Sequence, residues 1–125
     1  MNPEDCKDLI KQFFKAVSGQ AKPRELLAQF VTDEALIQHV LMFEAAFPRY
    51  EINAEDLIAE NDKVAVRATV HATHRGELMG IAPTGREITQ STLIIYVIEA
   101  AKIDHHWMVF DRLDLMQQLG IAPRP

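Results

Sequence analysis

The spacing of apolar and polar residues divides the chain into a helical first part and a strand-rich second part. Asn2 and Pro3 form a helix start, and the apolar positions that follow recur every three or four residues, which predicts an amphipathic helix. These positions are Leu9, Ile10, Phe13, Phe14 and Val17. Helical spacing resumes over residues 23–48, in short pieces divided near Thr32 and Asp33.

From residue 50 onward the apolar period falls to two residues, which predicts β-strands. Residues 50–76 contain two predicted strands joined by a turn at Asn61 and Asp62. Pro83 and the glycines on either side of it predict a longer turn after them. The remaining predicted elements are a strand over residues 87–100, a strand over residues 103–111 and a closing helix over residues 112–120.

Helices first and a meander of antiparallel strands afterwards predict an α+β fold, because a parallel sheet needs helices and strands in alternation. The stretch "TLIIYVI", residues 92–98, is apolar on both faces of its predicted strand. Helices can cover only one face of the sheet in so small a domain. We therefore expect a second copy of the chain to cover the other face, giving a homodimer.

The composition is that of an ordinary globular domain. The 125 residues predict a single domain over residues 1–125, long enough to bury a core without disulfides. The 13 basic residues are outnumbered by 18 acidic ones and are scattered, so the chain is not expected to bind nucleic acid.

Cysteine usage and the N-terminus predict a cytoplasmic protein that is not inserted in a membrane. Cys6 is the only cysteine, which excludes an intrachain disulfide and favours a reducing compartment. The first residues carry charges where a signal peptide needs an apolar run, and no apolar stretch approaches the ~20 residues that span a bilayer.

The histidine spacings do not favour a metal site. His71 and His74 point to opposite faces of an extended strand, and so do the adjacent His105 and His106. No HExxH motif, activated nucleophile or glycine-rich phosphate loop is present. The sequence therefore predicts neither a metal nor an organic cofactor.

Asp111, at the end of the last predicted strand, is the strongest candidate for acid–base chemistry. If side chains alternate strictly along this strand, one set of residues shares a face with Asp111. A β-bulge would change which residues share that face. This set is Ile103, His105, Trp107, Val109 and Asp111, and the opposite set is Asp104, His106, Met108 and Phe110. A carboxylate among aromatic groups loses hydration, which raises its pKa. Such a group can remove a proton from a substrate and return it at neutral pH. The alternative is structural, because an aspartate in this position often caps the following helix.

Three stretches together resemble the SnoaL-like polyketide cyclases, also called ester cyclases. They are "AFPRYEI", then "ENDKVAVRATVHATHRGELMGIAPTGREI", then "KIDHHWMVFDRLDLMQQLG". The most specific features are the "FP" before the first long strand, the H-x-G-x-x-x-G-x-x-P-T-G run from His74 to Gly85, and the W-x-x-x-D motif that precedes "QLG". The resemblance extends from about Asp33 to Gly120.

This resemblance implies a nuclear transport factor 2-like fold, a cone of curved antiparallel sheet capped by helices and usually dimeric through its outer sheet face. Cyclases of this family close a ring by an intramolecular aldol reaction without metal or organic cofactor. Their acid–base aspartate falls on Asp111 of this chain. Candidate groups that line the cavity or bind substrate are His39, His74, His105 and Trp107. Apolar lining candidates are Phe13, Phe14, Phe43, Phe47, Met42 and Met79.

Two functions are compatible with these observations. The first is a cofactor-independent acid–base enzyme that works on a small hydrophobic carbonyl compound through Asp111. The second is a non-catalytic dimeric module that binds a small apolar ligand in the same cavity. Because the region between Val31 and Phe47 is compact, we expect a cavity smaller than one for a multi-ring polyketide.

Overall fold

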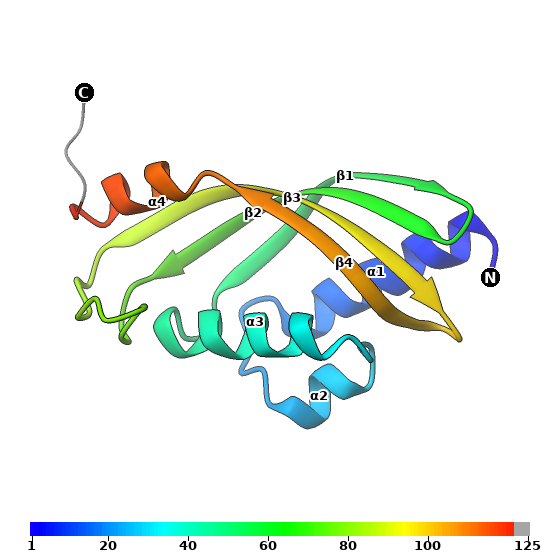
Figure 1. Cartoon of the computed structure of the whole chain (residues 1–125), viewed down its shortest axis with the longest axis horizontal. Helices are drawn as coiled ribbons and strands as arrows, with labels where there is room; N and C mark the ends of the chain where they lie inside the picture. Colours follow the sequence, from blue (N-terminus) through cyan, green and yellow to red (C-terminus); the bar gives the residue numbers. More distant parts are fainter. Residues whose placement is uncertain (122–125) are drawn as a thin grey trace.

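The computed structural model describes residues 1–121, in which four helices surround one face and one end of a four-stranded sheet (Figure 1). The elements are α1 (Pro3–Val17), α2 (Arg24–Ala28), α3 (Glu34–Ala46), β1 (Glu51–Glu60), β2 (Lys63–Thr73), β3 (Glu87–Glu99), β4 (Lys102–Phe110) and α4 (Arg112–Gln118). The strands pair in chain order and all pairs are antiparallel. The predicted α+β fold with a helical first part and a strand meander is confirmed.

Helix α1 has the N-terminal cap and the apolar face that the sequence predicts. The side chain of Asn2 accepts a hydrogen bond from the backbone N–H of Asp5 at 2.8 Å, and Pro3 occupies the first turn. The buried residues lie on one face and pack against the sheet; they are Cys6, Ile10, Phe13, Phe14 and Val17. None of the helices in the described part of the chain has the length and apolar character needed to span a bilayer.

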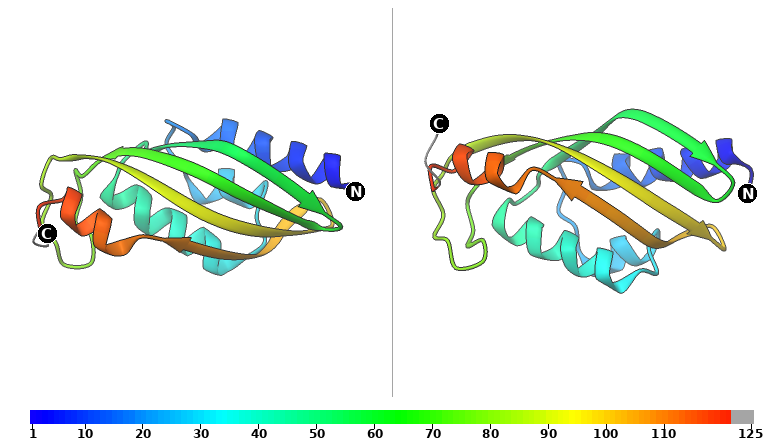
Figure 2. Two further views of the ribbon diagram at one scale, coloured as in Figure 1. Left: turned by 90° about the horizontal axis from the view of Figure 1, so that it is seen from above. Right: turned by 45° about the horizontal axis from the view of Figure 1, so that its top comes forward.

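The two faces of the sheet have different surroundings. Helices α1, α2 and α3 lie beneath the concave inner face, and the central part of the outer face carries no helix (Figure 2). One inward row across the four strands consists of Leu57, Val66, Ile94 and Met108. The neighbouring outward row consists of Ile58, Ala65, Ile95 and Trp107. Alternation along the strands therefore separates a core face from an apolar face that is open in the monomer.

A β-bulge interrupts the alternation near the start of β4. Ile103 pairs with Ile98, but the next pair along the ladder joins His105 to Val97, so Asp104 has no partner on β3. One extra residue reverses the side-chain direction of everything that follows. Ile103 is fully buried, and beyond the bulge the inward residues of β4 become His106, Met108 and Phe110.

The bulge is also the place where the start of α3 joins the sheet. The backbone N–H groups of Thr32 and Asp33 donate to the carbonyl oxygen of Ile103 at 2.9 and 3.3 Å. The hydroxyl of Thr32 donates to the carboxylate of Asp104 at 3.1 Å. Nδ1 of His106 lies 2.7 Å from Oδ2 of Asp33. These contacts fix the N-terminus of α3 against β4.

Asp33 has a second role as the N-cap of α3, where its Oδ1 accepts a hydrogen bond from the N–H of Leu36 at 3.3 Å. Burial, the largest single influence, raises the pKa of Asp33. The hydrogen bond from His106, those from the backbone N–H groups of Leu36 and Ala35, and the charge of His106 together outweigh burial and bring the pKa below its ordinary value.

We predict that Asp33→Ala lowers the free energy of unfolding by about 1–2 kcal/mol, because it removes both the cap and the partner of His106. Asp33→Asn should have a smaller effect, since asparagine caps a helix as well as aspartate does. Urea unfolding followed by far-ultraviolet circular dichroism measures both. Equal destabilisation by the two variants would contradict the assignment of a capping role to Asp33.

Candidate functional site

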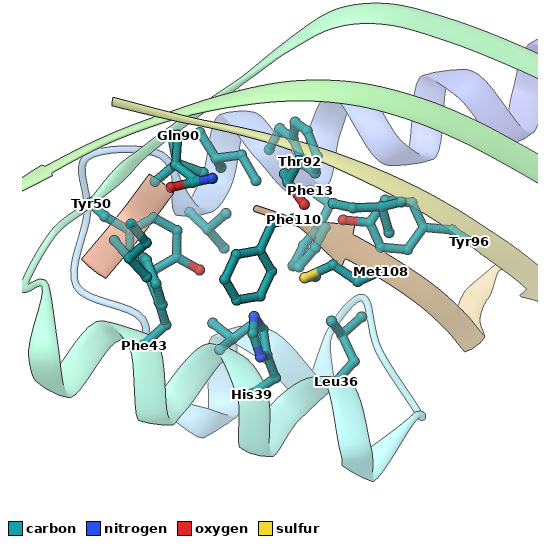
Figure 3. Close-up of a pocket in the computed structure, with 17 residues that line it drawn as sticks. Phe13, Leu36, His39, Phe43, Tyr50, Gln90, Thr92, Tyr96, Met108 and Phe110 are labelled. Atoms are coloured by element: carbon teal, nitrogen blue, oxygen red, sulfur yellow. The ribbon is translucent and has the colours of Figure 1, made fainter. Parts of the chain in front are cut away.

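A cavity of about 60 Å³ lies between the inner face of the sheet and helices α1 and α3 (Figure 3). Its wall draws on two clusters of buried apolar residues, one beneath the middle of the sheet and one near α4, so the cavity occupies their junction. No lysine, arginine, aspartate or glutamate lines it. Its polar lining residues are His39, Tyr50, Gln90, Thr92 and Tyr96.

His39 is the only lining residue that ordinarily titrates near neutral pH. It lies on α3, and its ring points into the cavity (Figure 3). Burial lowers the pKa of His39, and the charge of nearby His106 lowers it further. His39 is therefore a neutral imidazole at pH 7, in the form that can accept a proton.

Two tyrosines provide hydroxyl groups on the walls around His39. The hydroxyls of Tyr50 and Tyr96 point toward the middle of the cavity (Figure 3). Burial raises the pKa of both phenols well above its usual value, with smaller contributions from Glu44 at Tyr50 and from Tyr50 at Tyr96. Both are therefore protonated donors at neutral pH. Neither hydroxyl has a hydrogen-bond partner within residues 1–121.

Gln90 adds an amide to the wall formed by β3. Its Nε2 donates to the backbone carbonyl of Asp111 at 3.2 Å, and its Oε1 is buried without a partner among the described residues. A buried acceptor without a partner is destabilising, so a ligand that donates a hydrogen bond would gain from meeting it.

A buried lysine holds Tyr50 in place. The ammonium group of Lys22 donates to the backbone carbonyl of Tyr50 at 3.0 Å and lies 4.0 Å from the centroid of its ring. It also pairs with the carboxylate of Glu44 on α3 at 2.9 Å. Burial lowers the pKa of Lys22, although the hydrogen bond and charge of Glu44 oppose the shift. This ion pair joins α3 to the start of β1 at the wall of the cavity.

Most lining residues are buried, and four of the five that are only partly buried lie on α3 and β4: His39 and Phe43 on α3, and Met108 and Phe110 on β4. The fifth is Ile52 on β1. We infer from this distribution that the mouth of the cavity lies between α3 and β4. A ligand would therefore pass between these two elements, beyond the point where Asp33 and His106 tie them together.

The structure places some of the predicted site residues together and separates others. Phe14, His39 and Phe43 line the cavity, as does Phe13. Phe47 is buried in the second apolar cluster, outside the lining. Met42 and Met79 are largely exposed.

The prediction that His105 and Trp107 face inward is wrong. Both side chains are exposed on the outer face of β4, where their rings meet edge to face at 4.5 Å. The cause is the bulge at Asp104, which reverses the alternation that the sequence pattern assumes.

Asp111 does not lie on the inward face of β4 either, and its carboxylate is not part of the cavity wall. Its side chain caps α4 by accepting a hydrogen bond from the N–H of Asp114 at 2.9 Å. The alternative interpretation of Asp111 as a helix cap is therefore confirmed. Its contact with the cavity is indirect, through the backbone carbonyl that holds Gln90.

His74 is fully buried but also lies outside the cavity wall. Its Nδ1 accepts a hydrogen bond from the backbone N–H of Thr84 at 3.1 Å and lies 3.0 Å from the hydroxyl oxygen of the same residue, and its Nε2 has no partner in the described residues. The ring packs on Phe47 at 5.3 Å. His74 thereby organises the loop between β2 and β3.

That loop also caps the C-terminus of α3. The backbone N–H groups of Arg75 and Gly76 donate to the carbonyl of Ala46, at 3.1 and 3.0 Å. A Cβ atom at Gly76 would lie 2.0 Å from the carbonyl oxygen of Ala45, so only glycine fits this approach. The glycine of the H-x-G motif thus has a packing role.

Sequence reasoning missed four polar lining residues: Tyr50, Gln90, Thr92 and Tyr96. The last three alternate with Ile94 along one face of β3. Polar side chains at inward positions of a central strand are unusual, and that signal was available in the sequence. In residues 1–121, no three His, Cys, Asp or Glu side chains are placed to hold a metal ion together.

Comparison with known proteins gives one family. The family model described as SnoaL-like polyketide cyclase matches residues 6–119. Among curated proteins, none matches this chain.

The fold recurs in solved structures. AclR of Streptomyces galilaeus is 24% identical, with a TM-score of 0.84 over 99% of this chain and 86% of AclR. TsrD of Streptomyces laurentii is 21% identical, with a TM-score of 0.82 over 98% of this chain and 99% of TsrD. A SnoaL-like polyketide cyclase from Agrobacterium tumefaciens is 23% identical, with a TM-score of 0.75 over 92% of this chain and 98% of that one. At these identities the likeness establishes the nuclear transport factor 2-like fold.

Proposed function

Because this chain belongs to the SnoaL-like polyketide cyclase family, we propose that it is a cofactor-independent acid–base enzyme acting on a small hydrophobic carbonyl compound. The reaction would be an aldol-type ring closure or a related isomerisation or elimination. The observation that supports this proposal best is the neutral imidazole of His39 inside an apolar cavity that also contains two protonated tyrosine hydroxyls.

The lining favours an uncharged substrate. A carboxylate or phosphate entering the cavity would lose its hydration without meeting an arginine or lysine, because none lines the wall. A ketone or ester loses less on entry, and its carbonyl oxygen can accept a hydrogen bond from a tyrosine hydroxyl. The small volume favours a compact molecule over a multi-ring one.

The chemical step would begin with proton transfer from the carbon next to the carbonyl to His39. The C–H bonding electrons move into an enolate, whose oxygen accepts hydrogen bonds from the hydroxyls of Tyr50 or Tyr96. The enolate carbon then attacks a second carbonyl of the same molecule and forms the new carbon–carbon bond. The resulting alkoxide takes the proton back from the His39 imidazolium, so the protein returns to its starting state.

Asp111 is the competing acid–base group, because the family resemblance assigns that role to its position. To reach a molecule in the cavity, its carboxylate would have to leave the N–H of Asp114 and turn inward past Phe110. The observed geometry therefore favours His39.

We also propose that the protein is a homodimer, in which the outer faces of two sheets pack against each other. Four large apolar side chains on β3 and β4 support this proposal, because they stay 41–69% exposed in the monomer. They are Leu93, Ile95, Trp107 and Val109.

We expect His39→Gln to slow proton abstraction about 10²–10⁴-fold, the usual contribution of a positioned base. Nuclear magnetic resonance measures this step as hydrogen–deuterium exchange next to the carbonyl of a small aryl ketone or β-keto ester in D₂O. Asp111→Asn is the control, because asparagine keeps the cap of α4, and it should exchange protons at close to the wild-type rate.

Two outcomes would contradict this assignment. Loss of exchange in Asp111→Asn with retention in His39→Gln would identify Asp111 as the acid–base group. Wild-type protein that binds the ketone but does not accelerate exchange would be a binding module and not an enzyme.

The pH dependence provides an independent test. If neutral His39 is the base, kcat/KM should be constant above pH 7 and fall as the pH drops through the pKa of His39, which burial places below 6.5. A carboxylate base would instead keep its activity down to about pH 4. A single inflection near 4 in the rate profile would therefore argue against His39.

We expect light scattering to give twice the chain mass for the wild type at micromolar concentration. Ile95→Glu places a charge in the middle of the outer apolar face and should give monomers. Leu113→Glu is the matched control, since Leu113 is also a large apolar residue that is exposed but lies on α4. A monomeric wild type, or dimers of unchanged stability in Ile95→Glu, would refute this interface.

A further inference from the structure

We propose that Phe110 is the size gate of the cavity: a ligand enters by displacing its ring, so Phe110 determines how large a carbonyl compound the protein accepts. The ring of Phe110 lies in the middle of the lining residues, between His39 on one side and Gln90, Tyr50 and Tyr96 on the others (Figure 3). This inference rests on the proposed function, in which the cavity holds the substrate.

The volume shows that some part of the wall must move. The cavity measures about 60 Å³, whereas the buried apolar cavity known to bind benzene measures about 150 Å³. Even a one-ring ketone is larger than benzene. It therefore cannot enter unless a side chain gives way.

The other aromatic rings of the wall are held by ring contacts. Phe13 packs on Phe30 at 5.4 Å, and Phe14 meets the edge of Tyr96 at 6.2 Å. Phe43 stacks on Phe47 at 4.5 Å and meets Tyr50 at 5.0 Å. Moving any of these rings would disturb a second ring and the core behind it.

Phe110 is not held in this way. It makes no ring–ring contact with another aromatic residue in the described part of the chain, and, like Phe43, it is only partly buried. It is also the last residue of β4, which is an edge strand of the sheet. On the open side of β4, the one described bridge joins Ile103 to Val31, at the opposite end of the strand from Phe110. A change of side-chain rotamer at Phe110 therefore has space on the mouth side of the cavity.

The position of the ring also connects the gate to the chemistry. In Figure 3 the ring of Phe110 lies between His39 on one side and Tyr50 and the polar groups of β3 on the other, so a ligand that takes its place would contact both sides. The volume that Phe110 vacates becomes the volume available to the substrate. Phe110 is in this sense a specificity-determining residue, and the acid–base groups are separate from it.

The test uses two uncharged ketones that differ by one ring, acetophenone and 2-acetonaphthone, with dissociation constants measured by ligand-observed nuclear magnetic resonance. Wild-type protein should prefer acetophenone at least 10-fold. Phe110→Ala should reverse this preference by binding 2-acetonaphthone at least 10-fold more tightly than the wild type does. Phe110→Leu, a smaller perturbation of the fold, should shift the preference in the same direction.

Leu26→Ala is the control, because Leu26 is also a partly buried apolar residue but does not line the cavity, and it should keep the wild-type preference. An unchanged preference in folded Phe110→Ala and Phe110→Leu, the same change in Leu26→Ala, or binding of neither ketone by any folded variant would overturn the gate. Proton exchange in the same samples tests the proposed function separately, since a gate can control binding in a protein that performs no catalysis.

Discussion

The extra residue in β4, Asp104, is the feature on which the arrangement of the cavity depends. It interrupts the ladder between β3 and β4, and the residue directly before it, Ile103, accepts hydrogen bonds from the N–H groups of Thr32 and Asp33 through its carbonyl oxygen. The same bulge that turns Met108 and Phe110 inward thus ties the N-terminus of α3 to the sheet. Both walls of the mouth, the α3 wall with His39 and the β4 wall with Phe110, are positioned by this one irregularity.

This arrangement explains how a small domain can keep a cavity beside a dense core. At its N-terminus α3 is held by the bulge and by the Asp33–His106 pair, and at its C-terminus by Lys22 and the loop that begins at Arg75. Between these anchors, the helix does not close on β4, and the residues that face each other there are only partly buried. The helix is fixed at both ends and spaced from the strand in its middle, where His39 lies.

Periodicity alone predicted the elements, the antiparallel meander and the cap at Asn2, because each depends on residues near one another in the sequence. The sequence also indicated that Asp111 could be a helix cap, and this alternative is correct. A cap can be predicted from sequence because it involves only the three residues that follow. The inward face of β4 could not be predicted in the same way. The bulge at Asp104 is stabilised by Thr32, more than seventy residues earlier, and nothing in the alternation of "IDHHWMVFD" marks it. His105 and Trp107 were misplaced for that reason alone.

The position of Asp111 shows how a family motif can contribute to a site without placing its side chain there. Asp111 begins α4, and α4 contributes Leu115 to the cavity wall. Its backbone carbonyl accepts a hydrogen bond from Nε2 of Gln90, whose Oε1 has no partner among the described residues and faces a ligand as a free acceptor. Phe110, the proposed gate, is the last residue of β4 and directly precedes this cap. A cap at Asp111 would therefore have to be preserved by a protein that uses this cavity, whether or not its carboxylate ever exchanges a proton with a substrate.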